Sequence, residues 1–379
     1  MRPSGSAPPG SVLTGERAPA RRPARTWALA RRPACQWAPG GRPARNWVPV
    51  VTAVAAAGAL ASCTASPSAL DPHGPQGAST ATLTWVMVGL AAVVWLAVMG
   101  LLVAGLLRRR RGEARPPDAA RDAGSGAIAL VVACGIVVPV LVLAGLMAVT
   151  ARTLAAVAAP PTATALTVEV TGHLWWWEVH YREPDVTTAN EIHVPAGQPV
   201  QLVLRSQDVI HSFWVPQLMG KLDVIPGQTN TTWLQADAPG TYRGQCAEYC
   251  GLQHAHMALL VIADAPTDFA AWLEAQRRPA TPPADPEAQR GAQAFAQVGC
   301  IACHRIRFGA AGAGGTEGPD LTHVGSRETL AAGTLPNTKG YLAGWIGNPQ
   351  AIKPGTKMPT LQVGGEDLRA LAAYLETLK

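Results

Sequence analysis

Two cysteines, two histidines and a methionine lie within one short stretch near the middle of this chain. The stretch reads Cys246-Ala-Glu248-Tyr-Cys250-Gly-Leu-Gln-His254-Ala-His256-Met257. Thiolate, imidazole and thioether donors together favour copper over hard cations, and the Cys-x3-Cys spacing is wider than the Cys-x2-Cys pair usual for structural zinc. A further imidazole is expected from a neighbouring strand end, where His211 is the best candidate. The stretch therefore predicts a soft-metal site.

This stretch resembles the dinuclear CuA site of cytochrome c oxidase subunit II. Two other segments resemble that family as well, Gly172-His-Leu-Trp-Trp-Trp-Glu-Val-His-Tyr181 and Leu222-Asp-Val-Ile-Pro-Gly227. The resemblance implies that two thiolates bridge two coppers, that each copper takes one imidazole, and that a thioether and a backbone carbonyl complete the set. These ligands would be Cys246, Cys250, His211, His254, Met257 and the carbonyl of Glu248. A disulfide between the two cysteines is the alternative in an exported domain, but it leaves the other donors unexplained.

The same resemblance gives two residues further roles. The side chain of Glu248 would help to bind a magnesium or manganese ion at the contact with subunit I. Trp175 holds the position of the surface aromatic through which electrons enter CuA. The alternative is that Trp175, Trp176 and Trp177 all pack the domain interior. His256 lies off the ligand pattern, so we interpret it as a residue beside the site or on the surface.

A second redox motif, Cys300-Ile-Ala-Cys303-His304, follows downstream and is the attachment signature of c-type haem. Two thiols reach the two vinyl groups of one porphyrin, and the adjoining histidine then lies beneath the iron. Such a motif can also bind zinc, but a helix carrying Gly291 and Phe295 before it resembles a small class I cytochrome c. That resemblance implies Met358 as the sixth iron ligand. A buried methionine is the alternative role, and His323 is the rival ligand.

Two uncharged apolar runs, residues 83–107 and 127–149, are each long enough to span a bilayer as a helix. The connector between them is rich in arginine, so the positive-inside rule places it in the cytoplasm. The sequence therefore predicts a transmembrane hairpin within residues 80–150. It also predicts a multi-pass protein of the bacterial plasma membrane, with its copper and haem domains on the outer face.

Residues 1–63 form a separate, basic leader. A ten-residue repeat, beginning at Arg22, Arg32 and Arg42, is too short and proline-rich for a solenoid. It leads into a signal peptide, and Leu60-Ala-Ser-Cys63 resembles a lipobox in which Cys63 would be lipidated. Ordinary cleavage nearby and a translation start further downstream remain the alternatives.

The remaining chain divides into two domains. Residues 164–265 alternate short apolar and polar runs between turns, which predicts strands on the scale of one antiparallel sandwich or barrel. Resemblance to subunit II makes this an all-β cupredoxin-like Greek-key barrel. A proline-rich tether, residues 278–286, leads to a small all-α cytochrome c domain at 287–379 and is expected to keep the two domains within reach. The predicted fold class is therefore multi-domain.

The formal net charge of +6 indicates no nucleic-acid partner, because the excess arginine lies in the leader and the connector. The resemblance implies a subunit that passes electrons from cytochrome c, through its fused haem c and CuA, to the haem of subunit I. Oxygen would be reduced to water there, coupled to proton translocation. Subunits I and III, and cytochrome c or a quinol-cytochrome c reductase as donor, are the implied partners.

Three other classes of protein are alternatives. A nitrous oxide reductase would need a large histidine-rich domain, which nine histidines do not supply. A CuA subunit of a nitric oxide reductase stays open, since the chemistry would again lie in a partner. A quinol oxidase subunit that has lost copper conflicts with the complete set of ligands.

Overall fold

The structure, a computed structural model, describes residues 67–112, 124–160, 162–309 and 311–379. The leader, its repeat and Cys63 lie outside these residues, as does the middle of the connector. The described residues all belong to one unit by their contacts.

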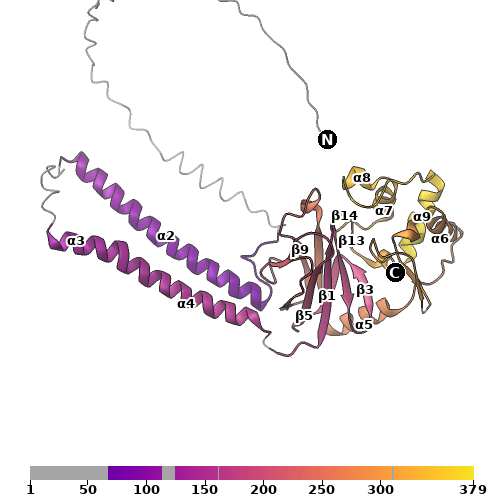
Figure 1. Cartoon of the computed structure of the whole chain (residues 1–379), viewed down its shortest axis with the longest axis horizontal. Helices are drawn as coiled ribbons and strands as arrows, with labels where there is room; N and C mark the ends of the chain where they lie inside the picture. Colours follow the sequence, from indigo (N-terminus) through magenta and orange to yellow (C-terminus); the bar gives the residue numbers. More distant parts are fainter. Residues whose placement is uncertain (1–66, 113–123, 161, 310) are drawn as a thin grey trace, which may run out of the picture. The chain divides into compact units, whose positions relative to one another are not determined.

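Two long apolar helical runs come first and lie side by side (Figure 1). The first is α2 (Pro75–Arg110), and the second joins α3 (Ser125–Val132), a π-helical turn (Ala133–Val137) and α4 (Val138–Ala158). Both are long and apolar enough to cross a membrane. Pro139, which lacks the N–H that would continue the regular hydrogen-bond ladder, lies two residues after the end of the π turn.

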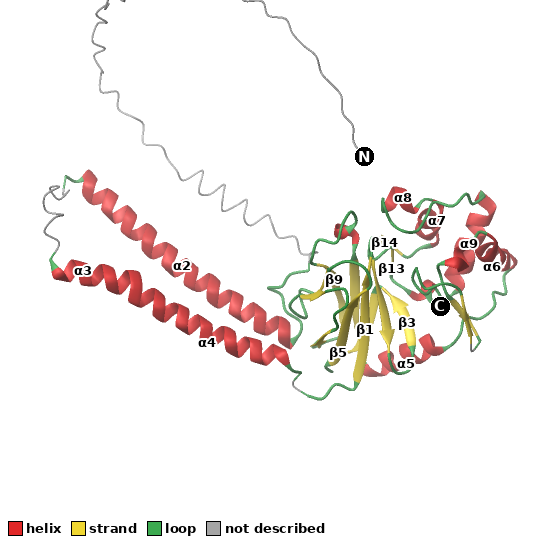
Figure 2. Ribbon diagram, in the orientation of Figure 1, coloured by secondary structure: helices red, strands yellow, loops and turns green. Residues whose placement is uncertain are grey.

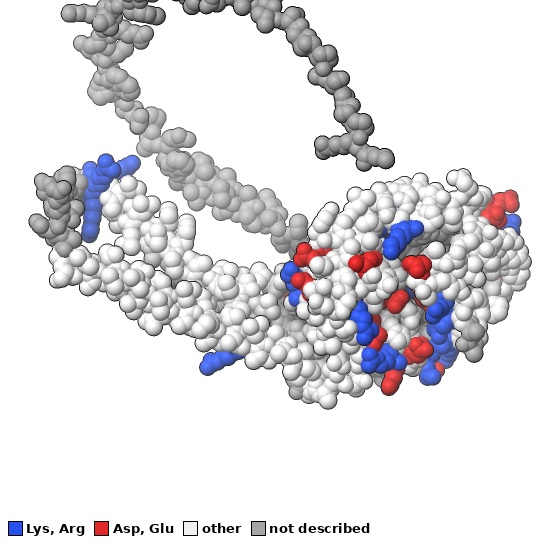
Figure 3. Space-filling view, viewed as in Figure 1, with Lys and Arg blue, Asp and Glu red and all other residues white. Residues whose placement is uncertain are grey.

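Both helices extend beyond the predicted spans because their ends contact the β domain. Gln76 in the first turn of α2 is buried, and its Nε2 donates to Trp233 O at 2.7 Å. Trp233 Nε1 in turn donates to Val157 O, near the end of α4, at 2.9 Å. At the opposite end of α2, Lys and Arg side chains gather around Arg108–Arg110, whereas both signs mix over the globular part (Figure 3).

Ten strands form the barrel domain, the name used below for residues 164–265 (Figure 2). The first sheet has the order β3-β2-β1-β5-β8, and the second has the order β4-β10-β9-β6-β7. The strands of the first sheet are β1 (Leu166–His173), β2 (Trp176–Tyr181), β3 (Val186–Ala189), β5 (Val200–Ser206) and β8 (Asn230–Leu234). The strands of the second are β4 (Glu191–Pro195), β6 (His211–Trp214), β7 (Leu222–Val224), β9 (Gly240–Cys246) and β10 (Ala258–Asp264).

The expected antiparallel sandwich or barrel contains two parallel pairs of strands. Strands β1 and β5 pair in parallel, and so do β10 and β4. The cause is the path of the chain, which leaves the first sheet after β3, contributes β4 to the second sheet, and returns as β5. A strand that arrives from the opposite sheet is not constrained to the antiparallel direction that a tight hairpin imposes.

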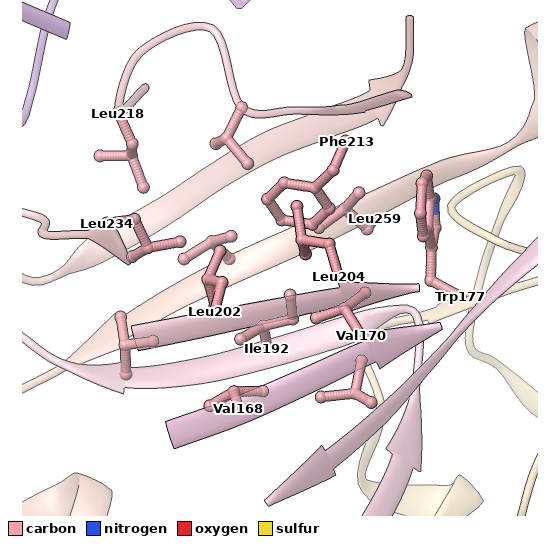
Figure 4. Close-up of a cluster of buried hydrophobic side chains, with 14 of the residues drawn as sticks. Val168, Val170, Trp177, Ile192, Leu202, Leu204, Phe213, Leu218, Leu234 and Leu259 are labelled. Carbon is pink, nitrogen blue, oxygen red and sulfur yellow. The ribbon is translucent and has the colours of Figure 1, made fainter. Parts of the chain in front are cut away.

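The core lies between the two sheets, where alternate residues of each strand point inward (Figure 4). Val168 and Val170 of β1 face Leu202 and Leu204 of β5 in register, and all four side chains are fully buried. Fully burying such a side chain stabilises the fold by about 1.5–3 kcal/mol. This rigid interior positions the strand ends that carry the candidate metal ligands.

Helix α5 (Pro266–Arg277) follows the barrel and was not predicted. Its Trp272 stacks on His193, with ring centroids 4.0 Å apart. The next residues are bonded to the C-terminal segment, the name used below for residues 287–379. Ala280 N donates to Arg307 O at 2.8 Å, and His323 Nε2 lies 2.9 Å from Arg278 O. The start of the expected tether is therefore fixed in place.

The C-terminal segment is mainly helical. Its helices are α6 (Pro286–Gln297), α7 (Lys339–Gly347), α8 (Pro349–Ile352) and α9 (Gly365–Thr377). Two short hairpins, β11 (Ile306–Phe308) with β12 (Ala311–Ala313) and β13 (Thr329–Leu330) with β14 (Leu335–Pro336), depart from the all-α expectation. Gly291 lets α6 cross α9, because a Cβ there would lie 2.0 Å from Ala370 O.

Candidate metal and haem centres

The candidate copper ligands come from two neighbouring strands and the loop after them. His211 is the first residue of β6, and Cys246 is the last residue of β9. These strands pair through Phe213 and Cys246, which brings the imidazole and the thiol to the same end of the barrel. Cys250 follows in the loop, and a 3-10 turn at His254–His256 directs the chain back into β10.

The two thiols lie at the centre of the group, and each has its own imidazole. The Sγ atoms of Cys246 and Cys250 are 3.7 Å apart, far beyond the roughly 2.0 Å of a disulfide bond. Cys246 Sγ is 3.9 Å from His211 Nδ1, and Cys250 Sγ is 3.6 Å from His254 Nδ1. Met257 Sδ lies 3.9 Å from Cys250 Sγ. Both cysteines are free, so the disulfide alternative does not describe this structure.

A backbone carbonyl completes the group on the side of Cys246. Glu248 O is 3.2 Å from Cys246 Sγ. The six candidate ligand residues of the sequence analysis are thus brought together by the fold. Among the described residues, His211, Cys246 and Cys250 form the tightest set, with donor atoms within 4.8 Å of one another and all three side chains buried.

Hydrogen bonding makes the two thiols unequal in acidity. The hydrogen bond between the two thiols, together with the neighbouring His211 imidazole, lowers the pKa of Cys246 against the opposing effect of burial. The same contact and burial raise the pKa of Cys250. The pair therefore releases one proton readily and the second with difficulty. A bound metal ion would favour the loss of both, because metals bind thiolates.

Asp208 orients the histidine and was given no role by the sequence reasoning. Its Oδ1 accepts from His211 Nε2 at 2.9 Å, which leaves Nδ1 directed at Cys246. Burial alone would lower the pKa of His211, but the bonds to Asp208 and Cys246 outweigh it and raise the pKa. Asp208 is itself held by the amides of Leu174 and Val209, each at 2.8 Å. A carboxylate behind a ligating imidazole is a common arrangement in metal sites.

The c-type motif lies at a cavity of about 210 Å³ that is lined by the C-terminal segment and by part of the barrel domain. Cys300, Cys303 and His304 line this cavity together with Met358 and with Trp345, which the sequence reasoning missed. Cys300 begins a 3-10 turn, so the motif is compact. The rival, His323, bonds instead to the carbonyl of Arg278 and does not line the cavity.

The orientation of His304 is set by the loop facing it. His304 Nδ1 donates to Pro319 O at 2.8 Å, which leaves Nε2 with its lone pair free for an iron ion. Burial lowers the pKa of His304, so the ring is neutral as a ligand requires. Gly318 allows this close approach, because a Cβ there would lie 2.6 Å from the imidazole Cε1.

Comparison with known proteins identifies the family to which these centres belong. The chain is 35% identical over 321 residues to cytochrome c oxidase subunit 2 of Alkalihalophilus pseudofirmus, a match that covers 82% of this chain and 91% of that protein. The chain belongs to the cytochrome c oxidase subunit II family. Residues 185–264 match the family model described as cytochrome C oxidase subunit II, periplasmic domain, and residues 288–379 match the model described as cytochrome c.

Further relatives cover shorter parts of the chain. Cytochrome c oxidase subunit 2 of Bacillus subtilis is 32% identical over 224 residues, 57% of this chain and 63% of that protein. The crystal structure of the periplasmic domain of subunit II of the Bradyrhizobium japonicum oxidase is 30% identical, with a TM-score of 0.30. The match covers 31% of this chain and 96% of the chain in that structure.

The subunit II family and the cytochrome c match imply copper and haem c, and the residues present fit both groups. Sulfur and imidazole donors suit copper, and here they lie close together. The two thiols are not joined by a disulfide bond. The haem motif faces a cavity whose wall includes both a neutral imidazole and a thioether. As a subunit II chain with two apolar helices, the protein is a membrane-anchored part of an oxidoreductase.

Trp175 connects the two candidate centres of this subunit II chain. Its indole Nε1 donates to Cys250 O at 2.9 Å, and its ring also lines the cavity of the c-type motif. The side chain is only 9% exposed, so it is not an open surface aromatic in this chain. Trp176 is buried against the C-terminal segment, and Trp177 is buried in the barrel core.

Two other residues of the loop lie at its margin. The side chain of Glu248 is 44% exposed, with Oε2 3.9 Å from Lys221 Nζ. His256 Nδ1 lies 2.8 Å from Gln253 Oε1, and the residue is exposed. His256 is therefore beside the candidate copper group and outside it, as its spacing predicted.

Proposed function

We propose that this chain is the electron-accepting subunit of a haem-copper cytochrome c oxidase. Electrons from cytochrome c would pass by way of the fused haem c and CuA to the haem of subunit I, where O2 is reduced to water with proton translocation. The observation that carries this proposal is the position of Trp175, which borders the haem cavity on one side and bonds to Cys250 on the other.

We assign six residues to a dinuclear copper centre, which would supply reversible one-electron chemistry when bound. Cys246, Cys250, His211 and His254 would hold the two ions. Met257 and the carbonyl of Glu248 would complete the set. The residues hold this arrangement by their own contacts, since Asp208 fixes the His211 ring and strand pairing fixes Cys246. A site held so firmly changes its geometry little when its charge changes.

Covalent haem c is assigned to Cys300 and Cys303, and His304 and Met358 would hold its iron. The bond from His304 Nδ1 to Pro319 fixes the ring plane. Met358 O accepts from Gln350 Nε2 at 2.8 Å, which restrains the loop that carries the thioether. A histidine and methionine pair raises the reduction potential of a haem relative to harder axial ligands.

Trp175 is proposed as the residue through which electrons enter the copper centre. Its indole N–H donates a hydrogen bond to Cys250 O. This hydrogen bond, followed by the covalent bonds within Cys250, gives a short route to the sulfur of that residue. The exposed carboxylate of Glu248 is proposed to bind magnesium or manganese at the contact with subunit I, where the partner would supply the other ligands.

We infer a multi-pass protein of the bacterial plasma membrane, with the barrel domain and the C-terminal segment on the outer face. The arginines that end α2 support this orientation, because basic residues are enriched on the cytoplasmic side of spans. Subunits I and III of the oxidase are the proposed membrane partners. The proposed donor is cytochrome c or a quinol-cytochrome c reductase.

The decisive experiment is an optical and EPR spectrum of the purified full-length chain, with copper and haem quantified. Two coppers per chain sharing one unpaired electron, beside a low-spin covalent haem, are expected. A Cys246→Ser variant should lose the copper signal and keep the haem. Haem without copper in the unaltered chain would refute the proposed route and leave a membrane-anchored cytochrome.

A further inference from the structure

A buried carboxylate of the barrel domain accepts hydrogen bonds from two residues of the C-terminal segment. Glu191, the first residue of β4, is 2% exposed. Its Oε1 accepts from Thr329 N at 2.8 Å and from Thr329 Oγ1 at 3.2 Å, and its Oε2 accepts from Glu328 N at 3.1 Å. An ionised carboxylate loses its hydration on burial and is tolerated when donors replace the water. Here every such donor belongs to residues 328–329.

A buried cation of the C-terminal segment in turn contacts the backbone of the barrel domain. Lys353 is 2% exposed, and its Nζ donates to Trp175 O at 2.7 Å and to Ala331 O at 3.1 Å. Burial lowers its pKa to about 7. Among the described residues no carboxylate lies within 4.0 Å of this ammonium, so backbone carbonyls from both sides of the interface are its partners.

The loop between these two contacts is held in a conformation that it would not keep alone. Ala331 and Ala332 have φ values of 53° and 58°, in the left-handed region that is unfavourable for a residue with a Cβ. Ala332 O accepts from Ala258 N of β10 at 3.0 Å, and the Ala332 side chain packs on Trp176. Contacts with the barrel domain therefore stabilise this loop.

The candidate copper loop is joined to the same interface. Gln253, between the candidate ligands Cys250 and His254, donates from Nε2 to Pro354 O at 2.7 Å. The adjoining Gly355 lies against Leu252 and the edge of the Trp175 ring, where a Cβ would approach Leu252 Cδ2 to 2.7 Å. Trp175 is thus covered by residues 353–355.

We propose that Glu191 and Lys353 are reciprocal anchors that lock the C-terminal segment onto the barrel domain in one position, with Trp175 enclosed between them. The occupant of the Trp175 face is then the chain's own residues 353–355, and a separate donor protein has no access to it. Such a donor must deliver its electron to the C-terminal segment. This last consequence rests on the proposed function, whereas the lock itself does not.

Oxidative footprinting of the full-length chain tests the lock without reference to copper or activity. Hydroxyl radicals should modify Trp175 slowly in the unaltered chain and several times faster in a Glu191→Ala, Lys353→Met double variant. Trp177, fully buried in the barrel core, is the internal control and should stay protected in both. Glu183→Gln with Lys339→Met, which changes an exposed acid and an exposed lysine, should leave the Trp175 rate unchanged.

Hydrogen exchange provides a second and independent readout. Loss of the buried acceptor in Glu191→Ala should speed exchange at the Glu328 and Thr329 amides by about tenfold or more. The Ala258 amide donates to Ala332 and does not contact Glu191. Its exchange should also become faster if the whole segment is released from the barrel domain. If exchange is accelerated only at residues 328–329, Glu191 holds these two amides alone and the lock is refuted. Rapid oxidation of Trp175 in the unaltered chain would also refute it. Glu191→Gln, which keeps one acceptor oxygen, should give an intermediate rate.

The electron-transfer consequence is measured separately, by flash-induced transfer between haem and copper in the assembled oxidase. The double variant should slow this step with the haem and copper spectra unchanged. If the footprint shows the lock and the chain binds no copper, the proposed function fails and the lock stands. If copper and haem are present and the footprint shows Trp175 open, the lock fails and the proposed function stands.

Discussion

Replacing Gly291 with alanine tests the packing of the C-terminal segment most directly. A Cβ at this position would lie 2.0 Å from Ala370 O, 2.5 Å from Ala370 C and 2.7 Å from Tyr374 Cβ. Contacts between real Cβ atoms and their neighbours do not fall below 3.0 Å, so α6 and α9 must separate by at least the difference between 2.0 and 3.0 Å. The nearest obstacle is backbone inside a helix, which cannot rotate away as a side chain can.

The expected loss in the free energy of unfolding is about 1–3 kcal/mol, the usual range for an overpacked core. For a segment of this size, each kcal/mol lowers the melting temperature by about 4–8 °C. Thermal unfolding of the full-length chain, followed by the Soret band of the covalent haem, measures the shift. The haem spectrum at low temperature should be unchanged, because Gly291 is not a residue that lines the haem cavity.

Gly344→Ala is the matched control. Gly344 lies inside α7, and an added Cβ there meets nothing within 4 Å. Alanine in such a helical position should stabilise the segment by about 0.5–1 kcal/mol. If Gly291→Ala melts at or above the temperature of Gly344→Ala, the close crossing of α6 and α9 is wrong.

Three further predictions concern the barrel domain. Asp208→Ala removes the acceptor that orients His211 and should weaken copper binding by about 10–100-fold, measured by competition with a chelator; unchanged affinity would exclude this positioning role. Trp175→Phe removes an N–H donor and should leave copper bound while slowing transfer from haem to copper in flash photolysis; an unaltered rate would remove Trp175 from the route. Burial raises the pKa of Glu169, but two hydrogen-bonded arginines outweigh it and hold the pKa below its usual 4.5. The stability that this group contributes is therefore present above pH 4.5 and lost as the pH falls through the lowered pKa. The melting temperature of Glu169→Gln should accordingly fall less on acidification than that of the unaltered chain.

The sequence predicted the parts of each centre that are close together in the chain. The spacing of Cys246, Cys250 and His254 within a loop, and the adjacency of Cys303 and His304, specify the chemistry locally, and the fold brings these residues together. The two apolar helices and the strand-rich domain also followed from local patterns. His211 and Met358 needed long-range assumptions. Pairing of β6 with β9 brings His211 to Cys246, and Met358 lines the same cavity as His304.

The features that sequence reasoning missed depend on contacts between distant residues. Asp208 lies beside His211 in the sequence, but its role appears only when Leu174 and Val209 orient the carboxylate. The burial of Trp175 depends on Lys353, 178 residues away. A proline-rich stretch looks like a free tether in sequence, and no local pattern reports that Ala280 bonds to Arg307.

The division of the candidate copper ligands between β6 and the loop after β9 has a consequence for the maturation of the protein. A newly made, unfolded chain carries the thiols and His254 as a loose chelating peptide, which any soft metal ion could occupy. The buried imidazole of His211 joins them only after two strands distant in sequence have paired. Metal delivered to the folded domain therefore meets a binding site of defined geometry, whereas metal captured during synthesis meets only a flexible one. The order of folding and metal delivery thus contributes to which metal the finished protein carries.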